Sequence, residues 1–317
     1  MMKLTISDCA GFFRENDCFL ILTHRRPDGD TLGSAAALCL GLRQLGKTAY
    51  VLRNPEATEK YSPVVAGLTT EEVAENATIV CVDTASTGML PAAFAHLADK
   101  ITLRIDHHAS ATSFTEMELV DGGSAACSEL IYEVLMALGV TLDRPLANAL
   151  YTAVSTDTGC FRFANTTAHT FQVAAACAAV SPDLYSLNNL FFATVSLARL
   201  QIQSYMIENA IFLQDRQVCI CPIPLEVEKE LGVTEDDMDN ISGYPRTIAG
   251  VKIAATLRIE KDTGKVKISL RAAPGYDAGK ICATFGGGGH AGAAGASMQM
   301  SMDEAVAALT EALPIIN

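Results

Sequence analysis

The sequence has 317 residues, of which 50% are hydrophobic and 19% are charged, and its formal net charge is −13. A chain of this length and composition can bury the cores of about two domains, which excludes intrinsic disorder as its main state. No apolar run reaches the roughly 18–20 residues that span a bilayer, and the N-terminus lacks the pattern of a signal peptide. We therefore expect a cytoplasmic protein without a membrane span.

The ten cysteines are scattered, mostly within apolar segments, and no two form a C-x-x-C pair. This distribution argues against a disulfide framework and against a zinc knuckle. We expect small buried thiols in a reducing compartment.

The first half of the chain alternates short β-branched runs with stretches of helical periodicity, which is the pattern of βαβ units. We expect an α/β domain over residues 1–185, with a mainly parallel sheet of about five strands flanked by helices. Strands are predicted at 19–23, 49–52, 78–82 and 101–105, and helices at about 33–46, 89–98, 125–138, 145–155 and 168–180. Such sheets bind ligands beyond the carboxyl ends of their strands.

The pattern changes after residue 181 to a long segment, 184–212, that has the periodicity of a helix and predicts a helical linker over residues 186–214. Strand-like runs then follow at 218–223, 251–259 and 265–270, the last two joined by the tight-turn sequence Asp262-Thr263-Gly264. Together with a glycine run and a helical pattern at about 302–313, they predict a smaller α+β domain with a mixed sheet, residues 215–317.

Carboxylates and histidines cluster where the predicted strands and one helix end. They are His24, Asp28 and Asp30 after the first strand, Asp83 after the third, Asp106-His107-His108 after the fourth, and Asp157 after a helix. An aspartate at a strand end is more often a turn residue or a helix cap than a functional group. If the strands are adjacent and parallel, however, all of these side chains meet at one edge of the sheet.

Carboxylates brought so close together would repel one another, and divalent cations would remove that conflict. Oxygen and imidazole ligands without a thiolate favour Mn²⁺, with Mg²⁺ or Co²⁺ as alternatives. Because there are more ligands than one ion needs, the pattern predicts two metal ions and an in-line displacement at phosphorus.

The order of these motifs resembles the DHH phosphoesterase superfamily over nearly the whole chain. It comprises His-x-x-x-Asp-x-Asp, then Asp83, Asp106-His107-His108, Asp157 and a glycine run that ends at His290. The length and the glycine-rich ending are most similar to the NrnA-type group of oligoribonucleases and 3′-phosphoadenosine-5′-phosphate phosphatases. That group combines a DHH domain with a C-terminal DHH-associated domain, whereas the RecJ exonucleases usually carry extra domains.

The resemblance implies two ligand sets, His24, Asp28 and Asp83 for one ion, and Asp30, Asp83, His107 and Asp157 for the other. In this arrangement Asp83 bridges both ions, and a hydroxide between them is the nucleophile. Asp106 is implied to orient a histidine, and His108 to face the substrate, with a structural role as the alternative for His108.

The resemblance also implies a substrate site in the second domain. Arg271 matches a family position that binds a phosphate, and Gly287, Gly288 and Gly289 with His290 would contact an anion or a base. Arg162 resembles a family position near the substrate, and its alternative is a surface salt bridge.

These motifs together imply a metal-dependent phosphoesterase that degrades short oligonucleotides to mononucleotides and dephosphorylates 3′-phosphoadenosine-5′-phosphate. One alternative is a phosphodiesterase for cyclic or linear dinucleotides. Another is a catalytically silent nucleotide-binding module, which the complete ligand set argues against. By analogy alone, a homodimer is an alternative to a monomer.

The net charge of −13 argues against binding of long duplexes, because proteins that bind them usually carry a basic stripe. Residues 245–300 nevertheless carry eight basic and three acidic side chains. We therefore expect a short single-stranded substrate, held by its end at a locally basic domain.

Overall fold

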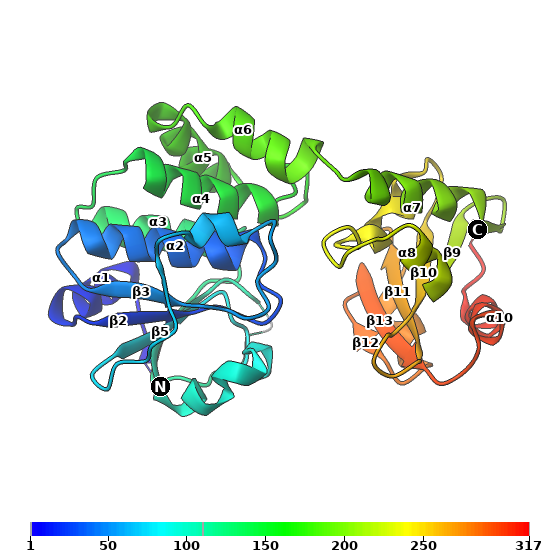
Figure 1. Ribbon diagram of the computed structural model, residues 1–317, viewed down its shortest axis with the longest axis horizontal. Helices are drawn as coiled ribbons and strands as arrows, with labels where there is room; N and C mark the ends of the chain where they lie inside the picture. Colours follow the sequence, from blue (N-terminus) through cyan, green and yellow to red (C-terminus); the bar gives the residue numbers. More distant parts are fainter. Residues whose placement is uncertain (1, 110, 317) are drawn as a thin grey trace. The chain divides into compact units, whose positions relative to one another are not determined.

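The structure is a computed structural model that describes residues 2–109 and 111–316. The chain divides into two compact units, Met1–Thr194 and Val195–Asn317 (Figure 1). The division lies inside the segment predicted as the linker. In the part of the chain that is described, no helix is both long and apolar enough to cross a bilayer.

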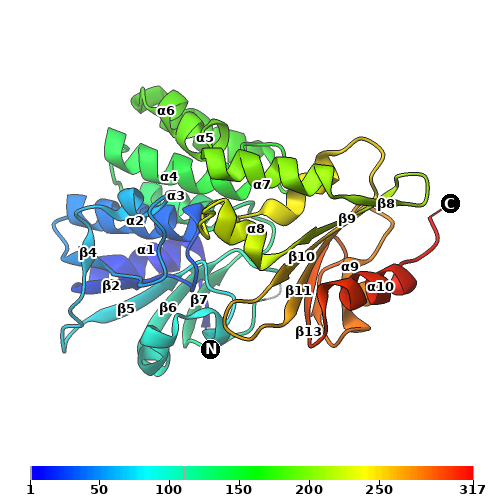
Figure 2. The same ribbon diagram turned by 45° about the vertical axis from the view of Figure 1, so that its right-hand side comes forward.

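The first unit is built on a sheet of seven strands in the order β1-β7-β6-β5-β2-β3-β4, and every neighbouring pair is parallel. Figure 2 shows β7, β6, β5 and β2 running side by side. The strands are β1 (Met2–Lys3), β2 (Phe19–Leu22), β3 (Ala49–Leu52), β4 (Thr69–Thr70), β5 (Thr78–Val82), β6 (Ile101–Asp106) and β7 (Met117–Val120). The prediction of a mainly parallel α/β sheet is confirmed, and the strands that the sequence did not indicate, β1, β4 and β7, have only two to four residues.

The helices of this unit are α1 (Ile6–Glu15), α2 (Gly29–Gln44), α3 (Cys127–Ala137), α4 (Arg144–Asp157), α5 (Ala168–Val180) and α6 (Leu184–Asn188). Short 3₁₀ segments lie at Ser62–Val65, Thr87–Met89 and Ala92–Lys100, and the last of these stands where a helix was predicted. α2 begins at Gly29, four residues before the predicted start. The reason is that the Asp28 carboxylate accepts hydrogen bonds from the N–H groups of Asp30 and Thr31 and caps the helix.

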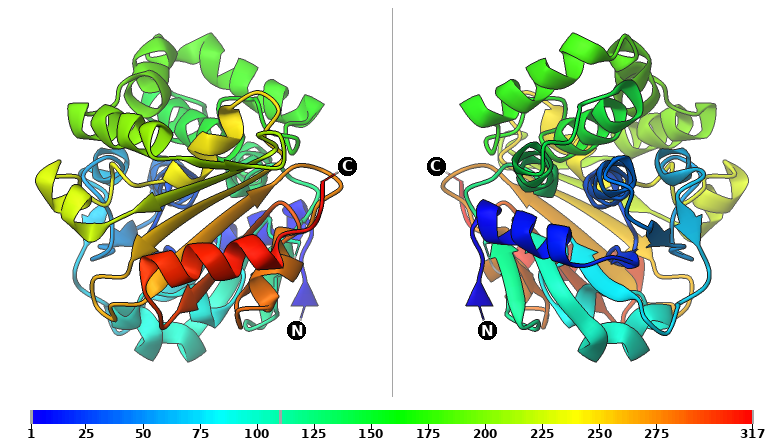
Figure 3. Two further views of the ribbon diagram at one scale, coloured as in Figure 1. Left: turned by 90° about the vertical axis from the view of Figure 1, so that its right-hand side faces the viewer. Right: turned by 90° about the vertical axis from the view of Figure 1, so that its left-hand side faces the viewer.

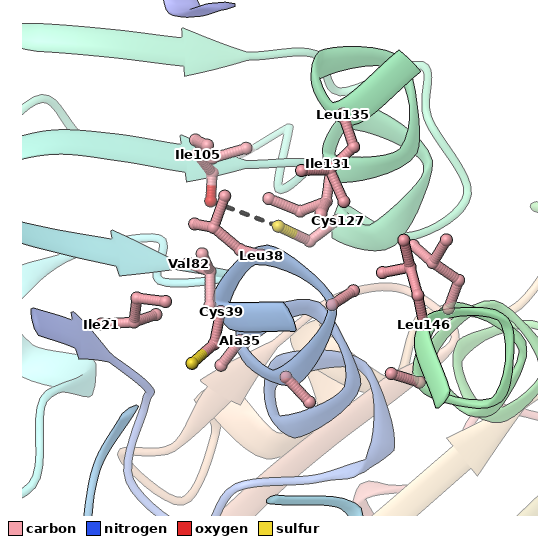
Figure 4. Packing of buried hydrophobic residues seen from close by; sticks show 14 of the residues in the cluster. Ile21, Ala35, Leu38, Cys39, Val82, Ile105, Cys127, Ile131, Leu135 and Leu146 are labelled. Atoms are coloured by element: carbon pink, nitrogen blue, oxygen red, sulfur yellow. Dashed lines mark hydrogen bonds between the residues drawn. The ribbon is translucent and has the colours of Figure 1, made fainter. Parts of the chain in front are cut away.

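Both faces of the parallel sheet are buried, as is typical when helices cover each side. Along β2, Phe19 and Ile21 face one core and Leu20 and Leu22 face the other. Figure 4 shows part of the first core, where α2 and α3 pack on the strands and the Cys127 thiol donates to the Ile105 carbonyl over 3.3 Å. All ten cysteines are free thiols, and most of them are buried.

The segment 184–212, predicted as one helix, is interrupted. α6 continues into a π-helical turn, Asn189–Ala193, and a new helix, α7 (Leu197–Glu208), starts at Ser196, whose hydroxyl accepts from the Arg199 N–H. The chain then enters β8 (Ile211–Leu213). The first helical stretch ends at Thr194 and a capping serine begins the next, which apolar periodicity alone does not reveal.

The second unit is a six-stranded sheet in the order β12-β13-β11-β10-β9-β8. Its elements are β9 (Val218–Ile223), α8 (Leu225–Glu230), the 3₁₀ segment Ile241–Thr247, β10 (Ile253–Ile259), β11 (Val266–Ala272), α9 (Ala278–Ala283), β12 (Gly288–Gly289), β13 (Ala293–Met298) and α10 (Met302–Ala312). β9 and β10 are parallel and the other pairs are antiparallel, so the predicted mixed sheet is confirmed. In the left view of Figure 3, α10 lies across this sheet, where Ala305 and Leu309 join its core.

Candidate metal centre

The predicted ligands of the first unit meet at the carboxyl ends of three adjacent strands, β6, β5 and β2. Asp106 ends β6, Asp83 follows β5 directly, and His24 lies two residues beyond β2. Asp28 and Asp30 lie at the start of α2, and Asp157 is the last residue of α4. The parallel topology therefore accounts for a convergence of side chains that are far apart in the sequence.

Three overlapping groups of side chains are close enough to hold a metal ion, with ligand atoms within 4.8 Å of one another. The groups are His24, Asp28 and Asp83; Asp30, His107 and Asp157; and Asp83, His107 and His108. The six side chains named as metal ligands from the sequence thus lie together, and Asp83 is shared between two of the groups.

Asp83 lies between two imidazoles and is 2% exposed. His24 Nε2 is 3.4 Å from its Oδ2, and His107 Nε2 is 3.4 Å from its Oδ1. Its backbone has φ of +54°, a left-handed conformation that costs about 1–3 kcal/mol in a residue other than glycine. Within the described residues, Oδ1 is buried and accepts no hydrogen bond. A buried carboxylate oxygen that accepts no hydrogen bond, in a strained turn, is typical of a functional position.

Asp30 has a second role besides facing His107. Its carboxylate accepts hydrogen bonds from the Ser34 hydroxyl (3.0 Å) and from the N–H groups of Cys127 (2.7 Å) and Ser128 (3.2 Å), at the start of α3. The Oδ2 atom is also 3.7 Å from His107 Nε2. These bonds fix the rotamer of Asp30, while its burial and the charges of Asp83 and Asp157 raise its pKa well above the usual value.

Backbone carbonyls set the tautomers of two histidines. The Nδ1–H of His24 donates to the Arg25 carbonyl (2.8 Å), and that of His107 to the Ser124 carbonyl (3.2 Å). When the rings are neutral, the lone pair of each Nε2 faces the carboxylates, as a metal ligand requires. His108 differs, because its Nδ1 is 2.7 Å from Asp106 Oδ1.

The electrostatics of the metal-free site reflect crowding of acidic groups. Burial alone would lower the pKa of His24 and His107, but the negatively charged aspartates that face their Nε2 atoms raise these pKa values to about 11 and about 10. Burial, with the charges of Asp83 and Asp28, raises the pKa of Asp157 to about 7. Burial would also raise the pKa of Asp83, but His107 and His24 hold it well below its usual value. The protonated imidazoles offset the negative charge of the aspartates, and bound metal cations can take over that role.

The residues present fit divalent ions, since four carboxylates and two imidazoles lie together, and one buried oxygen among them, Asp83 Oδ1, accepts no hydrogen bond. Such oxygen and nitrogen donors without thiolate suit Mn²⁺ and Mg²⁺.

Arg104 is a site residue that the sequence analysis missed. It is 1% exposed, and its guanidinium lies 3.1 Å from Glu118 and 3.7 Å from Asp106. It also donates to the carbonyls of Thr84, Ala85 and Thr112, so it binds the turn that follows Asp83. The only signal in the sequence was a lone cation inside an otherwise apolar strand.

The predicted substrate residues of the second unit are described within that unit. Arg271 lies near the end of β11, opposite Ala293 of β13, and it is half-buried, which lowers its pKa. A Cβ on Gly287 or Gly289 would lie 2.2 or 2.6 Å from a carbonyl oxygen of β13, so these glycines allow close strand packing. Gly288 has no atom within 4 Å of a Cβ position and is open to a ligand, and His290 is exposed in the turn before β13.

Arg162 belongs to the first unit and lies just beyond the metal-ligand candidate Asp157. It is exposed, and its Nε donates to the Gly159 carbonyl over 2.6 Å. Among residues 2–109 and 111–316 it forms no ion pair, so the alternative of a salt bridge finds no support.

Two family profiles match the chain. Residues 18–154 match the profile described as the DHH family, N-terminal domain, and residues 216–314 match the DHHA1 domain. These ranges fall in the first and second units, respectively.

Similar proteins cover both units. The bifunctional oligoribonuclease and PAP phosphatase NrnA of Thermus thermophilus is 32% identical over 92% of this chain and 88% of its own length. The protein of the same name from Bacillus subtilis is 26% identical over 91% of each chain. The fold resembles an exopolyphosphatase-related protein of Bacteroides fragilis (TM-score 0.86, 22% identity, 97% and 94% of the two chains). It also resembles exonuclease RecJ bound to manganese (TM-score 0.53, 12% identity, 99% and 96%).

Proposed function

The chain belongs to the DHH family of phosphoesterases, and on this basis we propose that it is an NrnA-like hydrolase with two activities. It degrades short oligonucleotides to mononucleotides, and it removes a phosphate from 3′-phosphoadenosine-5′-phosphate. The observation that carries the proposal is the convergence of every expected ligand around Asp83. Similarity to relatives called oligoribonuclease and PAP phosphatase, extending over both units, supports the choice of substrates.

Two divalent ions are the proposed cofactors. His24, Asp28 and Asp83 would hold one, and Asp30, Asp83, His107 and Asp157 the other, with Mn²⁺ as the first expectation. When bound, such ions supply Lewis acidity at phosphoryl oxygens and lower the pKa of water. The protein contributes the fixed rotamers of Asp30, His24 and His107 described above, so the site is organised before substrate arrives.

His108 is the proposed proton donor. Because Asp106 Oδ1 accepts from Nδ1, the other ring nitrogen, Nε2, is the one that can meet the substrate. The hydrogen bond that His108 donates to Asp106 also raises the pKa of His108 and favours the protonated ring. A protonated Nε2 can neutralise charge on a phosphoryl oxygen or donate to the leaving oxygen. The His108 side chain is 33% exposed, so a substrate can reach it.

Arg271, Gly288 and His290 are the proposed substrate contacts of the second unit. Arg271 is half-buried, and among the residues described its only hydrogen-bond acceptor is the Leu270 carbonyl. A guanidinium held away from carboxylates can bind a phosphate bidentately. Arg162 would add a contact from the first unit.

The experiment that tests the proposal measures mononucleotide release from a 5-mer RNA and phosphate release from 3′-phosphoadenosine-5′-phosphate. Both reactions are expected with Mn²⁺ and are expected to stop when a chelator is added or in the Asp83→Ala variant. If the wild type with Mn²⁺ turns over neither substrate, or if Asp83→Ala matches it, the proposal is wrong.

A further inference from the structure

The loop that follows the candidate ligand Asp157 holds an exposed aromatic side chain that none of the proposed steps uses. Phe163 is 50% exposed, although it lies only six residues beyond Asp157. Its ring rests on Gly159, because a Cβ at position 159 would come 2.4 Å from the Cζ atom of Phe163. Two peptide units separate Gly159 from Asp157, so their Cα atoms are at most about 7.6 Å apart.

The loop has an unusual backbone that brings this ring into place. Gly159, Cys160 and Phe161 all have left-handed conformations, with φ of +56°, +57° and +63°. Such a run is unfavourable for residues other than glycine and persists only where the surroundings fix it. Phe161 packs between the buried Tyr151 and the exposed Phe171, and these ring contacts stabilise the turn.

Hydrogen bonds hold the loop to the metal centre. The N–H groups of Arg162 and Phe163 both donate to the Thr158 carbonyl, over 2.9 and 3.0 Å. The Asn165 amide donates to the carbonyls of Asp157 and Ala125, over 3.2 and 3.0 Å. Ala125 follows Ser124, whose carbonyl accepts from His107. These bonds connect the loop that carries the Phe163 ring to Asp157 itself and, through Ala125 and Ser124, to His107.

We propose that Phe163 is a stacking surface for the nucleobase of the nucleotide bound at the metal centre. This inference rests on the proposed function and specifies how the site recognises a nucleotide rather than any phosphate ester. A rigid exposed ring provides contact area at little entropic cost, and stacking accepts every base because each has a π face. Arg162, whose Nε is fixed by Gly159, stands beside the ring as a cation for the attached phosphate.

A fluorescence experiment tests the inference without catalysis. The sequence contains no tryptophan, so Phe163→Trp introduces a single reporter at this position. In a buffer with Mg²⁺, AMP is expected to quench the emission saturably, whereas ribose 5-phosphate, which lacks a base, is not. The matched control is Tyr185→Trp, at an aromatic side chain that is 77% exposed on α6, and it is expected to show no saturable quenching. Equal responses of Phe163→Trp to the two ligands, or no response to AMP, would overturn the inference.

A kinetic experiment separates this inference from the proposed function. The measured quantity is the ratio of kcat/KM for 3′-phosphoadenosine-5′-phosphate to kcat/KM for ribose 3,5-bisphosphate. In Phe163→Leu the ratio is expected to fall about 10-fold, and Phe163→Tyr is expected to restore it. An active wild type whose ratio is unchanged by Phe163→Leu contradicts the stacking role alone. A wild type that hydrolyses neither compound contradicts the proposed function, and the fluorescence result then decides the stacking role independently.

Discussion

His108 Nδ1 and Asp106 Oδ1 are 2.7 Å apart, and the aspartate side chain of this pair is buried whereas the histidine side chain is 33% exposed. The same carboxylate oxygen accepts from the backbone N–H groups of His107 (2.9 Å) and His108 (3.2 Å). Asp106 thus fixes both the backbone of the two histidines and the ring of the second one. A carboxylate so used orients an imidazole without touching the substrate itself.

Asp106→Asn is expected to lower kcat by about 100-fold or more with little change in KM, because the amide no longer enforces the tautomer that presents Nε2 of His108. His108→Gln is expected to cause a similar loss. Asp106 acts through His108, so both variants remove the same contribution to catalysis. The double variant should therefore lose little more activity than either single variant. Steady-state kinetics of the three variants check this, and fully multiplicative losses would show that the residues act separately.

Binding of Mn²⁺ at pH 7 is expected to release protons. In the metal-free protein the pKa values of His24 and His107 are raised to about 11 and about 10, so both rings are protonated at pH 7, whereas metal ligands must be neutral imidazoles. Each ring loses its proton on binding, so the affinity for Mn²⁺ should rise as pH rises towards these values. Titration calorimetry in buffers with different ionisation enthalpies measures the release. A binding enthalpy that is independent of the buffer would contradict this expectation.

Arg104→Met is expected to destabilise the first unit by about 3–5 kcal/mol, because it leaves Glu118 and Asp106 buried without their cation. Adding Glu118→Met should recover part of that loss, since one unpaired charge is removed. Urea unfolding followed by circular dichroism measures both effects. Arg258→Met is a matched control in the second unit, where Arg258 pairs with buried Glu228 over 2.7 Å. A loss below about 1 kcal/mol for Arg104→Met would contradict the account of a network that holds the turn after Asp83.

Gly287→Ala and Gly288→Ala are expected to have different effects. A Cβ at position 287 would lie 2.2 Å from the Gly295 carbonyl oxygen, so this variant should lower the melting temperature. A Cβ at position 288 meets no atom within 4 Å, so that variant should change stability by less than about 0.5 kcal/mol. If Gly288 faces the substrate, the Gly288→Ala variant should raise KM. Thermal unfolding and KM values check the pair, and a stable Gly288→Ala variant with unchanged KM would remove Gly288 from the substrate site.

The convergence of the candidate ligands could be predicted from the sequence because each of these residues follows an apolar run that forms a buried parallel strand, or ends a helix beside it. The parallel order of β6, β5 and β2 then brings them together. What could not be predicted depends on particular capping hydrogen bonds and on packing. The early start of α2 depends on the hydrogen bonds of Asp28, and the break before α7 on the cap formed by Ser196. Residue type alone favours an exposed arginine and a buried phenylalanine, whereas packing buries Arg104 and leaves Phe163 exposed.

The most direct test of the central claim is a turnover panel with Mn²⁺, comprising RNAs from 2-mers to 24-mers, linear and cyclic dinucleotides, and 3′-phosphoadenosine-5′-phosphate. We predict mononucleotide release that is fastest for the shortest linear RNAs and falls with length, together with release of phosphate from the bisphosphate. No Mn²⁺-dependent release from any short RNA, or a preference for the 24-mer or for a cyclic dinucleotide, would contradict this account.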